Sequence, residues 1–507
     1  MQTSANTQNN FLYKKDSFID LLSYRLILFL VIFIPFEDFL LKFLPVSDRL
    51  YLYARFLSEA FIYILFAIVI AQRLIKRISF VKTPLDFPIF AFLGIVLMSA
   101  ILNKAGIFAS VTSIRPIIRY IVLFYLIVNI NITLTRANTI IRYCIYVGTA
   151  QLIFGITQFI SRGAINNFLR PRASETDIGG VTKNFVVLSG REIGSIYGAA
   201  GDTVLFATFM TLFLILILSK MYIANHQIIK YDKSYLVKSS SKKKNVLLSI
   251  LILSTIIAIA LSYVRVCLFA ALIILIAYLL LEFYKRKRKQ IGILLILLSL
   301  LIPIISINIS FLNDLNGPEY VGNARRTEQT VVDNMTGIFT ERYLKIARRQ
   351  RLGALIDIPL TVIYNKPFLG YGPDQLLTIE NLNNSPTSFL TKEWTKEGFK
   401  DVYWVALLAF YGIAGLSTTI WIFYRLHRWA RIIYNRTQKK VIKEISLSVM
   451  FIILITAFLL FFNRTIEFRI YSIYFWLLPG LMFNLYREEK LTLSKKSYIN
   501  NFYLLDK

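Results

Sequence analysis

Cysteine and histidine are almost absent from this chain. Its 507 residues include 2 cysteines and 2 histidines. Cys144 and Cys267 both lie in apolar segments, so we expect small buried side chains rather than a disulfide framework. His226 and His427 have no cysteine or carboxylate pair at ligand spacing, which argues against a zinc site. The sequence therefore predicts no metal and no cofactor.

Glycine motifs that bind nucleotides are missing as well. The sequence contains no G-x-x-x-x-G-K segment and no G-x-G-x-x-G segment after a predicted strand. Both absences argue against an enzyme driven by ATP or by a dinucleotide. A substrate that carries its own leaving group needs neither.

Charged residues are few, and long apolar runs take their place. Hydrophobic residues make up 56% of the chain and charged residues 17%. Repeated apolar runs long enough to cross a hydrocarbon core of roughly 30 Å indicate an all-α polytopic membrane protein. The net charge of +29 would also suit nucleic acid. However, the basic residues gather in short stretches between apolar runs, as the positive-inside rule requires. We expect a lipid bilayer as partner and no nucleic acid.

Hydropathy predicts about twelve transmembrane helices. Basic stretches near 72–82, 238–245, 285–289 and 427–440 then fall on one side, which the positive-inside rule assigns to the cytoplasm together with both termini. The predicted spans lie near 20–36, 54–72, 84–102, 114–132, 139–160, 203–223, 246–263, 265–284, 291–311, 402–424, 443–463 and 470–486.

This topology places two long loops outside, 161–202 and 313–401. The second contains turn signals around the helical stretch TERYLKIARRQRLGALIDIPLTVIY. The predicted organisation is a cytoplasmic tail 1–19, spans within 20–312, the large outer loop 313–401, spans within 402–486, and a cytoplasmic tail 487–507.

Arg265 interrupts the apolar run of residues 246–284. A guanidinium at the centre of a bilayer costs at least about 2.5–3.5 kcal/mol. Because the run is too long for one span, we expect a helical hairpin that turns near residues 262–265 at the outer face. Arg265 then either reaches lipid phosphates by snorkelling or binds a substrate phosphate between helices.

Further arginines are predicted in the outer loops. Arg191 lies shortly before a helix entry rich in Gly and Ala, whose backbone N–H groups we expect to be free to face an anion. The large loop carries a basic cluster, which forms either a solvated helix face or a grip on an anion. The cluster comprises Lys345, Arg348, Arg349 and Arg351.

Two glycines and one aspartate complete the candidate site. Gly370 and Gly372 permit a tight turn or the close approach of a ligand. Asp401 precedes a span, where its carboxylate either caps the helix N-terminus or acts as a general base. Separate arginine sites with one carboxylate suit a lipid diphosphate, since guanidinium groups bind phosphate oxygens in pairs and stabilise a diphosphate leaving group.

These segments resemble, in their order, the O-antigen ligase and O-antigen polymerase family of bacterial surface-polysaccharide assembly. An Arg-x-x-Gly loop is seen at Arg191 to Gly194, and Arg265 follows Val264 where the family usually has serine. The start of the third span, TPLDFPIF, is also similar. Arg351 precedes a Pro-x-x-Gly-x-Gly segment at 367–372, and a Gly-x-x-Gly segment follows at 412–415.

The resemblance implies a metal-independent, inverting glycosyltransferase with a GT-C-like fold in the bacterial inner membrane, with its active site on the periplasmic face. Its donor would be an undecaprenyl-diphosphate-linked oligosaccharide and its acceptor a growing glycan, with a chain-length regulator as a further partner. Arg191, Arg265 and Arg351 would hold the diphosphate, and Asp401 would orient or deprotonate the acceptor hydroxyl. Further candidate substrate-binding residues are Arg348, Arg349, Gly370 and Gly372.

One departure from the family pattern bears on the activity. Ligases of the family carry a His-Asn pair before the last Gly-x-x-Gly, whereas this chain has Asp401 followed by Val402. Polymerases often carry aspartate there, so the chain resembles a polymerase more than a ligase. The alternatives are a ligase acting on lipid A-core or another acceptor, and a flippase for lipid-linked oligosaccharides. Transporters built from two halves should show matching interrupted helices, and the sequence shows no such repeat.

Overall fold

The computed structural model describes residues 18–43, 48–161, 164–169, 196–228, 238–262, 264–284, 351–385 and 402–503. These residues form helices, and none of them forms a strand. The predicted all-helical class is therefore confirmed for this part of the chain. Its helices are α2 (Phe18–Phe33), η1 (Ile34–Phe36), α3 (Glu37–Leu41), α4 (Asp48–Ile75), α5 (Asp86–Leu102), α6 (Ile107–Asn129), α7 (Leu134–Ile160), α8 (Asn166–Leu169), η3 (Gly198–Ala200), α9 (Thr203–Ile228), α10 (Lys238–Leu261), α11 (Arg265–Tyr284), α15 (Arg351–Asn365), α16 (Gln375–Asn383), α18 (Tyr403–Arg436), α19 (Lys440–Leu459), η5 (Thr465–Glu467) and α20 (Arg469–Tyr503).

Eight helical segments of the described chain are long and apolar enough to cross a membrane. Each of the predicted spans falls on a helix, except the one near 291–311, which lies outside the described residues. The apolar parts of α5 and α10 are shorter than a full span, and α20 is not among the candidates. The candidate spans are Phe18–Leu41, Tyr53–Ile75, Ile107–Asn129, Leu134–Ile160, Thr203–Asn225, Arg265–Glu282, Tyr403–Arg436 and Lys440–Leu459.

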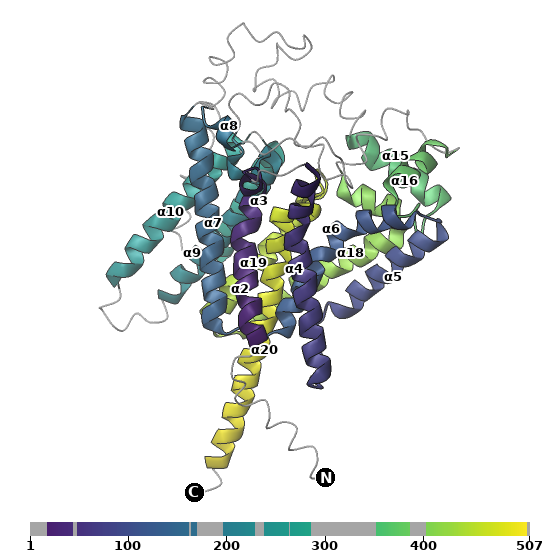
Figure 1. Ribbon diagram of the computed structural model, residues 1–507. Helices are drawn as coiled ribbons and strands as arrows, with labels where there is room; N and C mark the ends of the chain where they lie inside the picture. Colours follow the sequence, from purple (N-terminus) through teal and green to yellow (C-terminus); the bar gives the residue numbers. More distant parts are fainter. Residues whose placement is uncertain are drawn as a thin grey trace, which may run out of the picture.

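Helix α9 forms the centre of the bundle. In its most apolar window 78% of the residues are buried, whereas the figure for α4 is 33%. A helix that is apolar on every side is expected to be surrounded by protein. Accordingly, α9 packs against α7, α10, α11, α19 and α20, and α4 lies at the periphery against α6 (Figure 1).

The small helices α3, α8, α15 and α16 lie at one end of the bundle, opposite the C-terminal end of α20 (Figure 1). At this second end, carbonyl groups at the end of α6 are bound by side chains of α20. Asn484 donates to the carbonyls of Ile127 and Ile130, both at 2.7 Å, and Arg487 donates to Val128 at 3.1 Å. A helix terminus inside a bundle needs such partners because water cannot supply them.

Candidate functional site

The structure describes only part of the predicted site. Arg265 begins α11, Gly370 and Gly372 lie in the turn between α15 and α16, and the backbone of Arg351 begins α15. The side chain of Arg351 is outside the described part of the chain. The predicted residues that lie wholly outside it are Arg191, Arg348, Arg349 and Asp401.

The helix break before Arg265 is present where the sequence predicts it. α10 ends at Leu261 and α11 begins at Arg265, whose side chain is half-buried. The Ser262 hydroxyl stabilises the break by donating to the Ile259 carbonyl at 2.6 Å. The backbone N–H of Ile196 donates to the Leu261 carbonyl at 3.2 Å, so the segment that follows the first long loop packs on the hairpin.

At the glycine- and alanine-rich entry to α9, the N–H groups of residues 197–199 are not free, contrary to the prediction. Gln158 accepts from the N–H groups of Tyr197 and Gly198 at 2.9 and 3.1 Å, and Gln151 accepts from Ala199 at 3.0 Å. Both glutamines are buried side chains of α7. The protein itself therefore occupies the donors that an anion would need.

The first N–H groups of α9 are occupied in the same way. The Asp202 carboxylate accepts from Val204 at 2.7 Å and from Leu205 at 3.0 Å, as an N-cap residue does. Burial raises the pKa of Asp202, and these two hydrogen bonds partly offset the effect. An anion placed at the start of α9 would therefore meet the Asp202 carboxylate, which already accepts from the first N–H groups of this helix.

The turn at residues 366–372 is hydrogen-bonded to a break in α18. The N–H groups of Tyr371 and Gly372 donate to the carbonyls of Ala409 and Phe410 at 2.8 and 3.0 Å. In the other direction, the N–H of Ile413 donates to the Pro367 carbonyl at 2.7 Å. The backbone groups that the break removes from the α18 ladder thus find partners in the turn. We call this pairing of residues 366–372 with 409–414 the backbone interlock.

Glycine is required at both sides of the backbone interlock. Gly370 and Gly412 have φ of 62° and 63°, which residues with a side chain rarely adopt. A Cβ at Gly370 would lie 2.5 Å from the Ala409 carbonyl oxygen, and a Cβ at Gly412 would lie 2.6 Å from the Leu369 nitrogen. Of the two alternatives left open by the sequence, this supports a tight turn in which the close neighbour is the chain's own backbone.

Helix α5 supports the backbone interlock with two polar side chains. The buried Ser99 hydroxyl lies 2.6 Å from the Leu369 carbonyl and 2.8 Å from the Phe410 carbonyl. Asn103 donates to the Gly370 carbonyl at 3.1 Å and accepts from Lys366 at 2.6 Å. One turn of α5 therefore holds both halves of the interlock.

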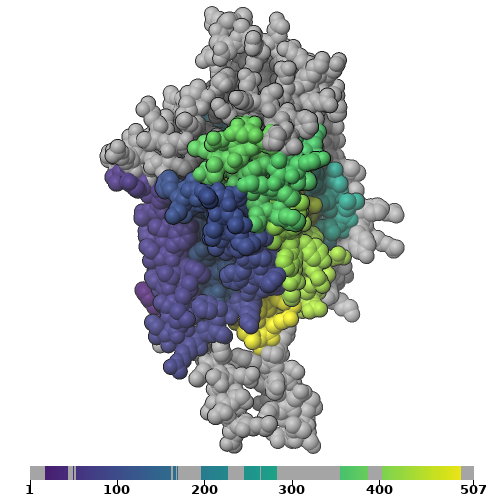
Figure 2. All heavy atoms as spheres, turned by 90° about the vertical axis from the view of Figure 1, so that its right-hand side faces the viewer, coloured from purple at the N-terminus to yellow at the C-terminus, as the bar shows by residue number. Residues whose placement is uncertain are grey.

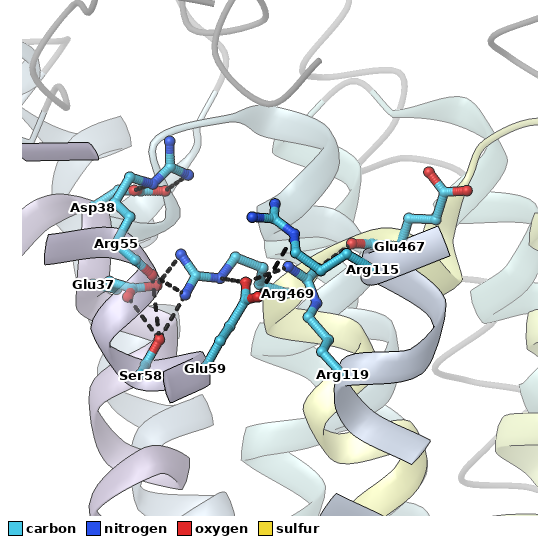
Figure 3. A network of polar contacts seen from close by, with 9 residues as sticks. All are labelled: Glu37, Asp38, Arg55, Ser58, Glu59, Arg115, Arg119, Glu467 and Arg469. Atoms are coloured by element: carbon cyan, nitrogen blue, oxygen red, sulfur yellow. Dashed lines mark hydrogen bonds and ion pairs between the residues drawn. The ribbon is translucent and has the colours of Figure 1, made fainter. Parts of the chain in front are cut away.

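A network of buried charges joins α3, α4, α6 and α20 at the same end of the bundle (Figure 3). At its centre is Glu59, whose side chain is 5% exposed. Its carboxylate lies 2.8 Å from Arg119, 3.6 Å from Arg469 and 3.7 Å from Arg115. Three guanidinium groups on two helices thus share one carboxylate of a third helix. Removing Glu59 would leave all three facing one another.

Arg469 extends this network to α3. Its guanidinium lies 2.8 Å from the Glu37 carboxylate and donates to the Ser58 hydroxyl at 2.6 Å. Ser58 in turn donates to Glu37 at 3.1 Å. Beside them Arg55 binds Asp38 through two nitrogens, at 3.0 and 3.3 Å, in the paired geometry that guanidinium favours.

The charge network reaches the start of α18 through residues 464–467. Arg119 donates to the Glu467 carbonyl, and the Glu467 carboxylate lies 3.6 Å from Arg464. Burial raises the pKa of Glu467, and the Arg464 guanidinium partly offsets this effect. Arg464 also lies 5.9 Å from the centre of the Phe410 ring. Since the Phe410 carbonyl accepts from the turn, the charge network and the backbone interlock meet at this residue.

Sequence reasoning missed the charge network. Its signal was available, because ionisable residues inside or at the ends of apolar helices are costly and rarely without a role. The signal was hidden by the position of these residues near predicted span ends, where a charge is ordinary. Within the described part of the chain, no group of three or more His, Cys, Asp or Glu side chains could hold a metal ion.

No family model matches this chain, and no curated protein matches it.

Proposed function

We propose that this protein is a membrane glycosyltransferase of the polymerase type, which transfers oligosaccharide from an undecaprenyl-diphosphate carrier to a growing surface glycan. The observation that carries the proposal is the backbone interlock. It joins two glycine segments that resemble the family pattern, at 367–372 and 412–415, although forty residues separate their glycines, 412 minus 372.

The backbone interlock supports the proposal because it joins the two helices that follow the candidate residues Arg351 and Asp401. Arg351 is the first described residue of the helix that leads into the turn, and α18 begins two residues after Asp401, 403 minus 401. Pairing the turn with the break in α18 fixes these two helices relative to each other. An arginine for the donor diphosphate and an aspartate for the acceptor would then belong to one rigid unit.

The finer architecture belongs to the same proposal. The chain would cross the bacterial inner membrane about twelve times, with both termini in the cytoplasm and with a GT-C-like arrangement. The eight candidate spans support a polytopic membrane protein. The grouping of α3, α8, α15 and α16 at one end supports placing the 161–202 and 313–401 loops on a common, periplasmic face.

In the proposed reaction, Arg191, Arg265 and Arg351 hold the donor diphosphate, with Arg348 and Arg349 nearby. Asp401 orients or deprotonates the acceptor hydroxyl, whose oxygen attacks the anomeric carbon. The bond from that carbon to the diphosphate oxygen breaks with inversion, and undecaprenyl diphosphate leaves with the bonding electrons. Guanidinium groups stabilise the charge that develops on the leaving group. The step needs no metal.

Complementation of a deletion strain tests the proposal. Arg351→Ala and Arg265→Ala should each abolish long glycan chains, whereas Arg431→Ala, an exposed arginine near the other end of α18, should restore them. Gel banding of the surface glycans and membrane-fraction blots give the readout. Full-length chains from both arginine variants, at normal protein levels, would overturn the assignment of these residues.

The same gel separates the proposed polymerase from the alternatives. Loss of a polymerase leaves one repeat unit on the finished glycolipid, whereas loss of a flippase leaves repeat units facing the cytoplasm. Loss of a ligase leaves long chains on the lipid carrier and none on the acceptor. Asp401→Asn tests the aspartate separately, and full activity of this variant would exclude Asp401 as a general base.

A further inference from the structure

Helix α15 is apolar on two opposite faces. One face is buried against α18 and includes Ala354, Ile358 and Val362. The opposite face is exposed and largely apolar, with the half-buried Asp357 at its edge. Its residues, with their exposed fractions, are Ile356 at 50%, Leu360 at 44%, Ile363 at 48% and Tyr364 at 78%. A helix that projects into water from a protein surface normally shows polar residues on its outer face.

The end of α15 lies at the depth of a membrane span. The turn that follows it is hydrogen-bonded to Ala409 and Phe410, which are inside the candidate span Tyr403–Arg436. Gly412 is nine residues after Tyr403, 412 minus 403, which places the break about 14 Å along the helix axis from its start. α18 has 34 residues, about 51 Å of helix, so the turn packs beside its first part, near the level at which a hydrocarbon core of about 30 Å would begin.

The turn that follows α15 contacts α5, and α5 and the start of α6 also expose apolar side chains. Asn103, at the end of α5, binds both the turn and Lys366, so the two regions are in contact. In Figure 2, α15 and α16 (green) lie directly over α5 and the start of α6 (blue). The exposed apolar residues of this surface are Leu97, Met98, Ile101, Leu102, Ile107, Phe108, Val111 and Phe368.

Two lysines lie at the edge of this apolar surface, and the next helix, α16, exposes polar residues. Lys104 and Lys366 are exposed where α5 meets the turn. On α16, Glu380 and Asn384 are exposed, although Leu376 on its first turn is apolar. Lysines at this position suit lipid phosphates, while an exposed carboxylate suits water.

We infer that α15 and the turn at 366–372 are embedded in one leaflet of the bilayer, with Ile356, Leu360 and Ile363 in contact with lipid acyl chains. The 15 described residues of α15 extend about 22 Å and end in a turn that reverses the chain beside α18. The turn is acceptable at this depth because α18 and α5 bind its backbone. Lys104 and Lys366 then lie near headgroup phosphates. The inference does not depend on the proposed enzymatic activity.

Site-specific labelling in liposomes tests the inference. Ile356→Cys, Leu360→Cys and Ile363→Cys are made singly and labelled with a bimane fluorophore. Cys144 and Cys267 are buried, so the unchanged chain gives the background. Glu380→Cys on α16 is the matched control. Lipids brominated on the acyl chain should lower emission from the three α15 labels and leave the α16 label unchanged, whereas aqueous iodide should quench the α16 label and leave the α15 labels unchanged.

Each other outcome overturns the inference. Quenching of the α15 labels by iodide would place this face in water. Insensitivity to both quenchers would show that another part of the chain covers it. Labels are placed at side chains that are already exposed, and thermal unfolding of each labelled protein shows whether the fold is retained.

Discussion

The charge network and the backbone interlock both satisfy buried polar groups, but they do so with different chemical groups. Both place polar atoms inside an apolar bundle. The network does so with side chains, which pair across α3, α4, α6 and α20 (Figure 3). The interlock does so with backbone groups, which pair because Gly370 and Gly412 allow two segments to touch.

The two regions therefore respond differently to substitution. In the charge network, the loss of one side chain removes part of the compensation of its buried partners, and poorly compensated buried charges are costly. In the backbone interlock, no side chain is essential at the glycine positions, and the harm comes from adding atoms. Substitutions that remove a side-chain group therefore test the charge network, and substitutions that add one test the backbone interlock.

The largest effect is expected in the charge network. Glu59→Ala removes the carboxylate that Arg115, Arg119 and Arg469 share. Breaking a buried ion pair from one side costs about 3–5 kcal/mol. We expect a loss of this size in the free energy of unfolding, measured in detergent with a thiol-reactive dye that reports exposure of Cys144 and Cys267.

Glu488→Ala is the matched control for Glu59. Its carboxylate also binds an arginine, Arg487 at 3.0 Å, but its side chain is 43% exposed. Exposed ion pairs contribute about 0–1 kcal/mol. Equal losses for the two variants would mean that the charge network contributes no more than surface pairs, and the comparison between the two regions would fail.

A loss of comparable size is expected in the backbone interlock. Gly412→Ala places a methyl group against the backbone of Phe368 and Leu369, which cannot move aside as a flexible side chain does. The residue also has φ of 63° and ψ of −164°, a conformation open almost only to glycine. The strain of about 1–3 kcal/mol adds to overpacking of about 1–3 kcal/mol. The same dye assay measures the sum.

Gly94→Ala separates this effect from the general cost of replacing glycine. Gly94 lies within α5, has no unusual φ, and an added Cβ would meet nothing within 4 Å. Alanine in a helix interior should stabilise the protein by up to about 1 kcal/mol. A destabilised Gly94→Ala together with a stable Gly412→Ala would contradict the geometry of the interlock.

The sequence was sufficient to predict the helices because hydropathy is a local property. The hairpin break at 262–264 and the start of α18 both follow from where an apolar run is interrupted or begins. The exception at the entry to α9 is instructive. Its glycines and alanines suggested free N–H groups, but Gln151 and Gln158, on a different helix, occupy them. No local pattern carries that information.

The same limit applies to the candidate site. Gly370 and Gly372 were selected correctly as unusual backbone positions, but their partner, the break in α18, is distant in the sequence. Glu59 and Arg469 are four hundred and ten residues apart, 469 minus 59, and they meet only because α20 packs beside α6, which in turn packs beside α4. Long-range pairing of this kind depends on the packing of whole helices, which periodicity does not specify.

The smallest effect is expected where the backbone interlock relies on a side chain. Ser99→Ala removes a hydroxyl that lies within hydrogen-bonding distance of the Leu369 and Phe410 carbonyls. Because Gly372 still donates to Phe410, we expect a loss of about 1–2 kcal/mol. Ser448→Ala is the control, since this serine is equally buried but bonds only to Glu444 within its own helix, and it should cost less than about 0.5 kcal/mol. If the two serines are equivalent in the dye assay, α5 does not fasten the turn to α18, and the interlock is held by its backbone hydrogen bonds alone.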